Sequence, residues 1–312
     1  MRDVFFIVGP TATGKSEIAA DVARELGAEI IGADAFQIYR GLDLLTAKPD
    51  ATTLAKVPHH LIGTMSILEE MNAEKFRKLA LGAISEIHSR GKLAIVVGGS
   101  GLYVKALTHG LSVAPAADPD LRARLSELSL ADLQKKLRAL DPKTAVDLKN
   151  RRRVMRAIEI SLASGKPAST QRTWKSETTQ GVFVFRERDD LYQRINRRVE
   201  GMFETGVIEE VGNAGAMSET ASKMIGLREI RELLDGKISI LSGRRGDTDS
   251  SRGEQCVAAI QQCTRRYAKR QLTWFRRQSN FQALNLSLLS QNEAVKEISQ
   301  IAKSFGVAQG ND

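Results

Sequence analysis

The segment from Gly9 to Ser16 constrains the fold more than any other part of the chain. It reads Gly-Pro-Thr-Ala-Thr-Gly-Lys-Ser, the G-x-x-x-x-G-K-[ST] pattern of a phosphate-binding loop. The apolar run Val4–Val8 precedes it, and a helix-like segment from Lys15 to Leu26 follows. The next apolar run, Glu29–Ala33, leads to Asp34. Because strand, loop, helix and strand are the context this motif requires, we predict an α/β fold with a P-loop-type parallel sheet flanked by helices.

The same segment predicts a binding site for a di- or triphosphate. Its glycines allow backbone N–H groups to converge on phosphate oxygens, and the N-terminus of the helix adds a partial positive charge. Lys15 supplies a full charge, and the Ser16 hydroxyl can coordinate a Mg²⁺ ion that screens the phosphates. The alternative, a glycine turn that binds nothing, does not explain the complete pattern. We expect the phosphates to contact Gly9, Pro10, Thr11, Ala12, Thr13, Gly14, Lys15 and Ser16.

Asp34 follows the second predicted strand, so its carboxylate should lie at the sheet edge where the phosphate loop opens. There it can be a magnesium partner, a general base or a helix cap, and the local pattern favours none of the three. The apolar run Leu93–Val97 predicts a central strand that ends at the same edge. Gly98–Tyr103 follows it, without the acidic residue that holds Mg²⁺ in many P-loop NTPases. The missing acid argues against an ordinary ATPase, and the Ser100 hydroxyl can donate to a phosphate oxygen.

The adjacent residues His59 and His60 do not predict a zinc site. Successive side chains of a strand point to opposite sides, so the two cannot face one metal ion. No cysteine or acidic ligand set lies nearby in the sequence. We expect the pair to serve the structure or to line the site.

The chain changes character after Leu111. Asp118-Pro119 is typical of a helix start, and the sequence from there to about Gly181 reads as several short helices. The apolar run Val182–Phe185 then predicts a return to the sheet. We therefore predict a catalytic core of residues 1–111 and 182–312 with basic C-terminal helices. Residues 112–181 are predicted to be a small all-helical insertion that contacts RNA.

The second half of the chain carries basic clusters. The formal net charge is +9 and the pI is near 9.6, which suits a nucleic-acid partner better than a small metabolite alone. We predict one helix from Asp190 to Glu210, a loop over Gly243–Gly253, and a helix from Glu254. In Thr264–Arg276 basic residues are interleaved with aromatic ones, which fits RNA because arginine contacts phosphates and aromatic rings stack on bases. Solvated helix faces and core aromatics are the alternative for each cluster taken singly.

No part of the sequence predicts a membrane or secreted protein. No window approaches about 18 consecutive apolar residues, and Met1–Asp3 runs directly into the first predicted strand, which leaves no room for a signal peptide. Cys256 and Cys263 lie two helical turns apart on one predicted helix, too far to form a disulfide. We expect reduced cysteines, a cytoplasmic location and, as the default, a monomer.

Together these segments resemble the tRNA dimethylallyltransferase family, also called the tRNA isopentenyltransferase family. The resemblance runs in family order from Gly9 to Arg277, and the motifs after the phosphate loop are the more specific ones. The matching pieces are Gly9–Ser16, the spaced residues Asp34, Gln37 and Tyr39, Thr46–Pro49, Val57–Ile62, Gly98–Tyr103, the spaced residues Arg153, Arg156, Ala157 and Glu159, and Thr264–Arg276.

The resemblance implies an enzyme that modifies tRNA. Members of the family transfer a dimethylallyl group from dimethylallyl diphosphate to N6 of the adenosine immediately 3′ of the anticodon, which gives N6-isopentenyladenosine. The phosphate loop then holds the diphosphate of the donor together with Mg²⁺, and the adenine has to leave the stack of the anticodon loop. Asp34 matches the catalytic aspartate of the family, and Arg198 matches an arginine that contacts the diphosphate. Ser100 stands where the family usually has threonine, and we count it with the catalytic residues.

The resemblance also implies contacts with the tRNA anticodon stem-loop. The matching positions are Asp34, Ala35, Phe36, Gln37, Ser100, Arg122, Arg152, Arg153, Arg156, Lys223, Arg228, Arg265, Arg266, Lys269 and Arg270. The chain departs from the usual family residues at Ala35, Phe36, Leu45, Gly63 and Leu227. None of these departures removes Lys15, Asp34 or Arg198.

Two other functions compete with this interpretation. A P-loop kinase or NTPase acting on a small metabolite explains the loop and the sheet, but not the missing acid at Gly98 or the basic helix around Arg265. A tRNA-binding protein without catalysis fits the charge and the departures. ATP turnover without a prenyl donor would favour the first, and tRNA binding without turnover would favour the second.

Overall fold

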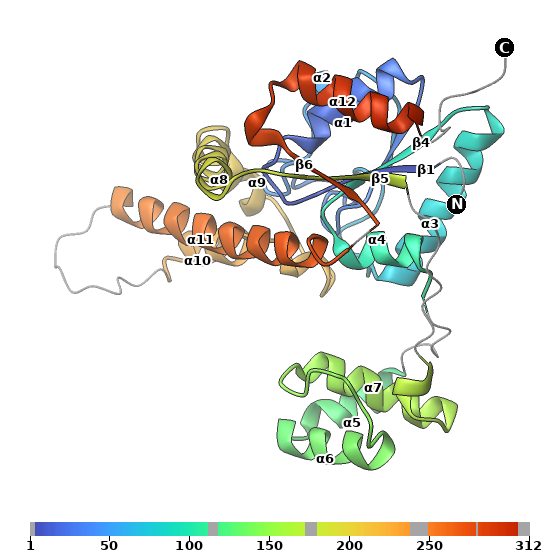
Figure 1. Ribbon diagram of the computed structural model, residues 1–312. Helices are drawn as coiled ribbons and strands as arrows, with labels where there is room; N and C mark the ends of the chain where they lie inside the picture. Colours follow the sequence, from blue (N-terminus) through green and yellow to red (C-terminus); the bar gives the residue numbers. More distant parts are fainter. Residues whose placement is uncertain (1–3, 112–117, 172–179, 238–248, 279, 305–312) are drawn as a thin grey trace. The chain divides into compact units, whose positions relative to one another are not determined.

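The computed structural model describes residues 4–111, 118–171, 180–237, 249–278 and 280–304 (Figure 1). The chain forms two compact units, one made of Met1–Thr108 and Glu177–Asp312 and the other of His109–Ser176. The smaller unit begins three residues before the predicted insertion and ends five residues before its predicted end. The end differs because Gln180 and Gly181 pair with the first strand and so belong to the sheet.

A parallel sheet forms the centre of the larger unit, and its strands follow the order β3-β2-β4-β1-β5-β6. The predicted α/β class with a parallel sheet is confirmed. The interior strands β1 and β4 are buried along their whole length, which explains their continuous apolar sequences. The strands are β1 (Val4–Val8), β2 (Glu29–Gly32), β3 (His59–His60), β4 (Ala94–Gly98), β5 (Gln180–Phe185) and β6 (Gln282–Asn285).

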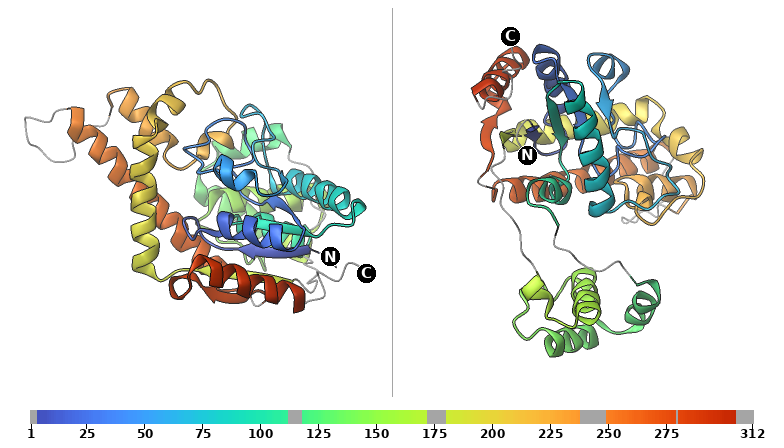
Figure 2. Two further views of the ribbon diagram at one scale, coloured as in Figure 1. Left: turned by 90° about the horizontal axis from the view of Figure 1, so that it is seen from above. Right: turned by 90° about the vertical axis from the view of Figure 1, so that its right-hand side faces the viewer.

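Helices cover both faces of this sheet (Figures 1 and 2). On one face, α1 (Lys15–Glu25) and α12 (Gln291–Ser304) pack on the side that receives Phe5 and Ile7. On the other face, α3 (Ala73–Ser89), α4 (Gly101–Thr108) and the end of α11 (Asp249–Phe275) pack on the side that receives Phe6. This division follows from the alternation of side chains along β1. Phe275 is buried here, so this aromatic residue of the basic helix is part of the core and is not available to stack on RNA bases.

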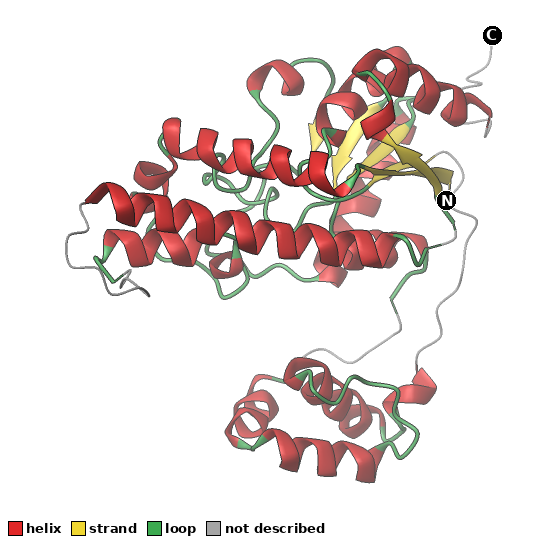
Figure 3. Ribbon diagram, turned by 60° about the vertical axis from the view of Figure 1, so that its left-hand side comes forward, coloured by secondary structure: helices red, strands yellow, loops and turns green. Residues whose placement is uncertain are grey.

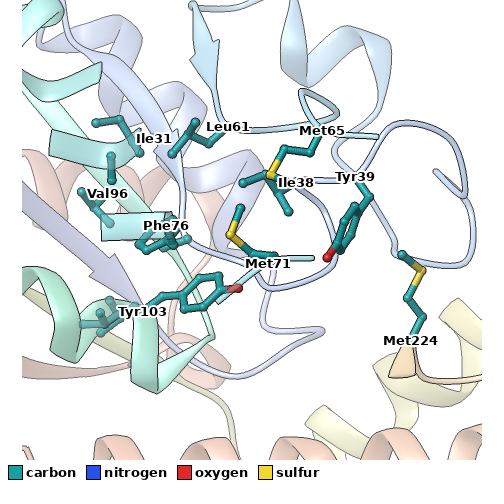
Figure 4. Close-up of a cluster of buried hydrophobic side chains, with 14 of the residues drawn as sticks. Ile31, Ile38, Tyr39, Leu61, Met65, Met71, Phe76, Val96, Tyr103 and Met224 are labelled. Atoms are coloured by element: carbon teal, nitrogen blue, oxygen red, sulfur yellow. The ribbon is translucent and has the colours of Figure 1, made fainter. Parts of the chain in front are cut away.

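Aromatic stacking fixes the second of these layers. Phe76 of α3 and Tyr103 of α4 stack with ring centroids 4.2 Å apart, beside Ile31 and Val96 of the sheet (Figure 4). Since Tyr103 directly follows Gly98–Leu102, its burial holds the loop after β4 against the core.

A buried carboxylate anchors the start of β2. Glu29 accepts hydrogen bonds from Arg90, and it pairs with His60 at 2.7 Å and Lys92 at 3.1 Å. These groups, Arg90 first, hold the pKa of Glu29 at about 2. His59 Nδ1 lies 2.7 Å from the carbonyl oxygen of Val57. Both histidines therefore have structural contacts.

Three further helices of the larger unit lie beyond the carboxyl edge of the sheet (Figure 1): α8 (Arg188–Glu204), α9 (Val207–Gly212) and α10 (Leu227–Leu234). The short α2 (Ala51–Leu54) packs against α1, where Lys56 pairs with Asp21. α8 and α11 pack side by side (Figure 3). The smaller unit contains α5 (Pro119–Glu127), α6 (Leu130–Leu140), α7 (Arg151–Ser164) and the short 3-10 helix η1 (Ala168–Gln171) around a leucine-rich core, and Asp118 caps α5.

Two predicted boundaries are wrong. The helix predicted from Asp190 to Glu210 is broken between α8 and α9, because Gly206 adopts a left-handed conformation with φ 98°. The loop predicted over Gly243–Gly253 is helical from Asp249 onward, since a long helix tolerates Gly253 at a cost of about 1 kcal/mol relative to alanine. The earlier residues of that loop lie outside the described residues.

Two sequence expectations concern thiols and membranes. Cys256 and Cys263 are both free. Among the helices that the structure places, none has the length and apolar character required to cross a lipid bilayer.

Candidate active site

The phosphate loop connects β1 to α1 in a tightly curved backbone. Ala12 and Gly14 both have positive φ angles, 64° and 87°, which turn successive peptide groups around one concave surface. Gly9 admits no side chain, because a Cβ there would lie 2.1 Å from the carbonyl oxygen of Val184 on β5. The Thr13 hydroxyl and Lys15 Nζ both donate to the carbonyl oxygen of Pro10, at 3.0 and 3.1 Å. The loop is thus closed on itself by its own side chains.

Three arginines, one directly after β5 and two on α8, contact this loop from outside it. Arg186 Nε donates to the carbonyl oxygen of Thr13 at 2.8 Å, and Arg194 Nε donates to that of Ala12 at 2.9 Å. Arg198 Nη1 donates to the Thr11 hydroxyl at 2.9 Å. Arg186 follows β5 directly, while Arg194 and Arg198 lie one turn apart on α8. The three guanidinium groups therefore lie beside the concave surface, and from Arg186 to Arg198 they contact the loop residues in reverse order, from Thr13 to Thr11.

The cations at the loop carry a desolvation penalty. Burial lowers the pKa of Lys15 to about 8, the attraction of Asp34 opposes this shift, and the repulsion of Arg198 adds to it. Burial is also the main cause that lowers the pKa of Arg198 and of Arg194. Buried like charges of this kind are stabilised by an anion, and a diphosphate is the anion that a phosphate loop accommodates.

Asp34 lies across from the loop at the carboxyl edge of the sheet. Its Oδ1 accepts hydrogen bonds from the backbone N–H groups of Phe36 at 3.0 Å and Gln37 at 3.4 Å. Asp34 therefore caps a turn over residues 35–38 and not a helix, since the next helix, α2, begins only at Ala51. Among the described residues its Oδ2 has no hydrogen-bond partner, and the side chain lines a pocket together with Thr11 and Arg198.

Ser100 and Gln37 hold the segment around Asp34 in place. Ser100 Oγ accepts from the backbone N–H of Ala35 at 2.9 Å. Gln37 Nε2 donates to the carbonyl oxygens of Thr46 and Ala47, at 3.2 and 2.7 Å. Both side chains therefore form hydrogen bonds with backbone groups, Ser100 with Ala35 and Gln37 with Thr46 and Ala47, and these bonds fix the segment that follows Asp34.

The pocket beside Asp34 has a polar end and an apolar end. It has an empty volume of about 670 Å³, part of it open to solvent. Thr11, Asp34, Arg198 and Tyr267 form the polar end, and burial, with Asp34 nearby, raises the pKa of Tyr267. The apolar lining consists mainly of Phe36, Leu45, Val199, Met202, Phe203, Val207, Ile225, Ile230 and Ile260. A ligand with a charged head and a short hydrocarbon tail matches this division.

The proposed tRNA contacts are distributed over both units. Arg122, Arg152, Arg153 and Arg156 lie in the smaller unit, where Arg122 and Arg156 both pair with the buried Glu159. The others are in the larger unit. Asp34, Ala35, Phe36, Gln37 and Ser100 lie at or next to the pocket, and the basic positions on η2 (Ala221–Lys223), α10 and α11 are Lys223, Arg228, Arg265, Arg266, Lys269 and Arg270. Arg265 bonds Asn196 of α8 and lies over the ring of Tyr192, whereas Arg266, Lys269 and Arg270 are exposed.

Sequence reasoning did not assign Arg186, Arg194 and Gln271 to the site. Arg194 could have been assigned from the sequence, because it lies four residues before Arg198 and so on the same face of the helix. Arg186 and Gln271 carry no comparable local signal, because the first reaches the loop from β5 and the second from α11. Across the described ranges, no group of three or more His, Cys, Asp or Glu side chains is arranged to hold a metal ion.

Comparison with known proteins agrees with this site. A family profile described as "IPP transferase" matches residues 37–278. The chain is similar to tRNA dimethylallyltransferase 1 of Citrifermentans bemidjiense, with 41% identity over 288 residues, 89% of this chain and 90% of that protein. It is similar to the tRNA dimethylallyltransferase of Akkermansia muciniphila, with 40% identity over 296 residues, 94% of this chain and 96% of that protein.

A solved structure extends this similarity to the fold. The full-length tRNA isopentenylpyrophosphate transferase of Bacillus halodurans superposes with a TM-score of 0.71 and 35% identity, covering 98% of this chain and 97% of that one. The profile match spans well over half of the chain, and the relatives exceed 30% identity over nearly all of it. This chain belongs to the IPP transferase family, the family of the tRNA dimethylallyltransferases.

Proposed function

We propose that this chain carries out the family reaction, transfer of a dimethylallyl group to tRNA, with the donor and the acceptor bound at opposite sides of the pocket between the phosphate loop and Asp34. The donor is dimethylallyl diphosphate, and the acceptor is N6 of the adenosine 3′ of the anticodon. The single observation that carries this arrangement is the pocket itself. Its polar end joins Thr11 and Arg198 to Asp34, and its remaining wall suits a five-carbon chain.

The donor half stabilises the leaving group. As the allylic C1–O bond breaks, negative charge accumulates on the departing diphosphate. Lys15 and Arg198 are already held at the loop, by the carbonyl oxygen of Pro10 and the hydroxyl of Thr11, so with the N–H groups of the loop they can stabilise this charge and lower the barrier. The three arginine contacts with the loop support the same role, because they fix the donors before substrate binds.

The acceptor half removes a proton. N6 of adenine attacks C1 of the dimethylallyl group, the C1–O bond breaks, and diphosphate leaves with the bonding electron pair. The amine then carries one surplus proton, and we assign its transfer to the free Oδ2 of Asp34. The other oxygen of Asp34 is held by Phe36 and Gln37, so the carboxylate keeps a fixed orientation during the transfer.

The residues at the loop fit a Mg²⁺ ion bound largely through the diphosphate. Ser16 supplies a hydroxyl at the first turn of α1, and in the described part of the chain this hydroxyl has no hydrogen-bond partner. An oxygen ligand with diphosphate oxygens and waters is the donor set that Mg²⁺ prefers. When bound, the ion would neutralise charge on the leaving diphosphate.

The tRNA contacts, the cellular location and the oligomeric state follow as part of this proposal. The basic side chains of α11 and of the smaller unit would bind the phosphates of the anticodon stem-loop. One chain supplies both halves of the pocket, which supports a monomer. We propose a cytoplasmic location because the proposed substrate is a tRNA.

Replacing Asp34 with asparagine tests the assignment. The amide side chain of Asp34→Asn would keep the Oδ1 cap but accept no proton. We expect single-turnover transfer from radiolabelled dimethylallyl diphosphate to an anticodon stem-loop to fall about 10²- to 10⁴-fold. Because Asp34 is only one of the proposed tRNA contacts, binding of the stem-loop should change much less than the rate.

Asp189→Asn provides the matched control, because Asp189 is exposed on the first turn of α8. It should retain the wild-type rate. A wild-type rate in Asp34→Asn would refute the role of Asp34. If the wild type released phosphate from ATP and put no label on the RNA, the protein would instead be a nucleoside triphosphatase.

A further inference from the structure

One face of α11 packs against the loop that follows β4. Tyr267, Gln271 and Trp274 lie four and three residues apart, which places them on the same side of the helix. Tyr267 interacts with the Ser100 side chain. Trp274 covers Gly101, where a Cβ would lie 2.5 Å from the indole ring. Gln271 lies between Tyr267 and Trp274 on this face, and its side chain also contacts the phosphate loop.

The amide of Gln271 joins two loops that are distant in sequence. Its Oε1 accepts from the backbone N–H of Thr11 at 2.9 Å, and its Nε2 donates to the carbonyl oxygen of Gly99 at 2.9 Å. The residue is only 5% exposed. Both ends of the side chain are therefore satisfied, and water does not compete with either hydrogen bond.

The backbone at Gly99 is shaped for this contact. A Cβ on Gly99 would lie 2.3 Å from Gln271 Nε2 and 2.8 Å from the carbonyl oxygen of Gly9. The two loops and the amide thus meet without an intervening side chain. Their spacing is set by the length of one glutamine.

We infer that Gln271 is a positioning residue for prenyl transfer, one that sets the distance between the bound donor and the acceptor base. This inference rests on the function proposed above. Thr11 is fixed by Gln271 at its N–H and by Arg198 at its hydroxyl, and Thr11 belongs to the donor loop. Gly99 precedes Ser100, whose Oγ holds Ala35 next to Asp34.

The consequence is kinetic. Nucleophilic attack requires the reacting atoms to lie about 3 to 3.5 Å apart, and a displacement of about 1 Å can reduce the rate about 100-fold. Loss of the Gln271 bridge frees Thr11 and Gly99 separately. We therefore expect both kcat and the KM for the donor to change, while the KM for the stem-loop does not.

Two substitutions distinguish positioning from stability. Gln271→Met keeps the length of the side chain and removes both hydrogen bonds, and it should lower kcat/KM for dimethylallyl diphosphate at least tenfold. Gln271→Glu keeps the acceptor for the Thr11 N–H but turns a carboxylate toward the Gly99 carbonyl oxygen. Its activity relative to the wild type should recover as the pH falls from 8 to 6, because a protonated carboxyl can donate to Gly99.

Gln262→Met is the matched control, since Gln262 is exposed on the same helix. All variants are assayed well below their melting temperatures, with the stem-loop affinity measured in parallel. Wild-type kinetics for Gln271→Met, or a pH-independent defect in Gln271→Glu, would overturn the inference. Absence of prenyl transfer by the wild type would instead contradict the proposed function.

Discussion

At the scale of single residues, the site concentrates positive charge before any substrate is present. Lys15 lies inside the phosphate loop, and Arg186, Arg194 and Arg198 contact three consecutive residues of that loop. Burial works against the charged forms, as the lowered pKa values of Lys15 and Arg198 indicate. The free protein therefore gives up some stability to keep a site in which a diphosphate relieves the repulsion.

The pKa of Lys15 predicts how the reaction depends on pH. A neutral amine cannot stabilise the diphosphate, and Lys15 in the free protein loses its proton near pH 8. Because the group has to be charged to bind, kcat/KM for the donor should be level below about pH 8 and fall about tenfold per pH unit above it. Initial rates at subsaturating dimethylallyl diphosphate and saturating stem-loop, from pH 6.5 to 9.5, measure this profile.

Lys15→Arg is the control for this prediction. Arginine keeps its charge throughout the range, so the variant should be slower but should show no fall between pH 8 and 9.5. The same fall in both proteins would mean that another group titrates.

At the scale of elements, the sequence predicts what depends on local pattern. The continuous apolar runs of β1 and β4, the loop between β1 and α1, and the start of α5 at Asp118-Pro119 all carry short-range signals. The bridge from Gln271 to Thr11 joins residues 260 positions apart, and nothing near Gln271 in the sequence marks it. Contacts of this kind follow from packing of α11 on the sheet, which local pattern does not determine.

The break between α8 and α9 was predictable in principle, because glycine is the residue that tolerates a left-handed backbone. Gly206 has φ 98° and separates Met202 from Val207, which both line the pocket. Gly206→Ala should destabilise the protein by about 1 to 2 kcal/mol and reshape the apolar end of the pocket. Thermal or urea unfolding measures the first effect, and the KM for the donor measures the second.

Gly201→Ala separates this effect from helix propensity. Gly201 lies inside α8 with open space around its Cβ position. Alanine there should stabilise the protein by about 0.5 to 1 kcal/mol. Equal effects of the two substitutions would show that Gly206 does not need its left-handed conformation.

At the scale of the whole molecule, most of the net charge of +9 lies in the smaller unit, whose 14 Lys and Arg against 7 Asp and Glu give +7 and leave +2 for the larger unit. α11 presents Arg266, Lys269 and Arg270 to solvent, and α7 of the smaller unit begins with three consecutive arginines, Arg151–Arg153. A small donor needs only the cations around the phosphate loop. The exposed cations of α11 and α7 are surplus to that requirement, and a long polyanion such as tRNA can use the cations of both units.

Salt dependence tests whether tRNA does so. Each lost phosphate contact should reduce the slope of log K against log salt by about 0.7 to 0.9. We therefore expect Lys269→Gln with Arg270→Gln to reduce the slope by about 1.4 to 1.8, and Arg152→Gln with Arg153→Gln to reduce it similarly. The slopes can be measured by filter binding of full-length tRNA at salt concentrations from about 50 to about 300 mM.

Lys296→Gln with Lys303→Gln removes the same charge from exposed positions on α12, which covers the opposite face of the sheet from α11. If long-range attraction by the net charge were sufficient, all three pairs would weaken binding equally and the slopes would not differ between them. If the RNA contacts α11 and the smaller unit, the α12 pair should leave the slope unchanged and the other two pairs should combine additively. A reduced slope for the α11 pair alone would restrict tRNA binding to the larger unit and contradict a contact by Arg152 and Arg153.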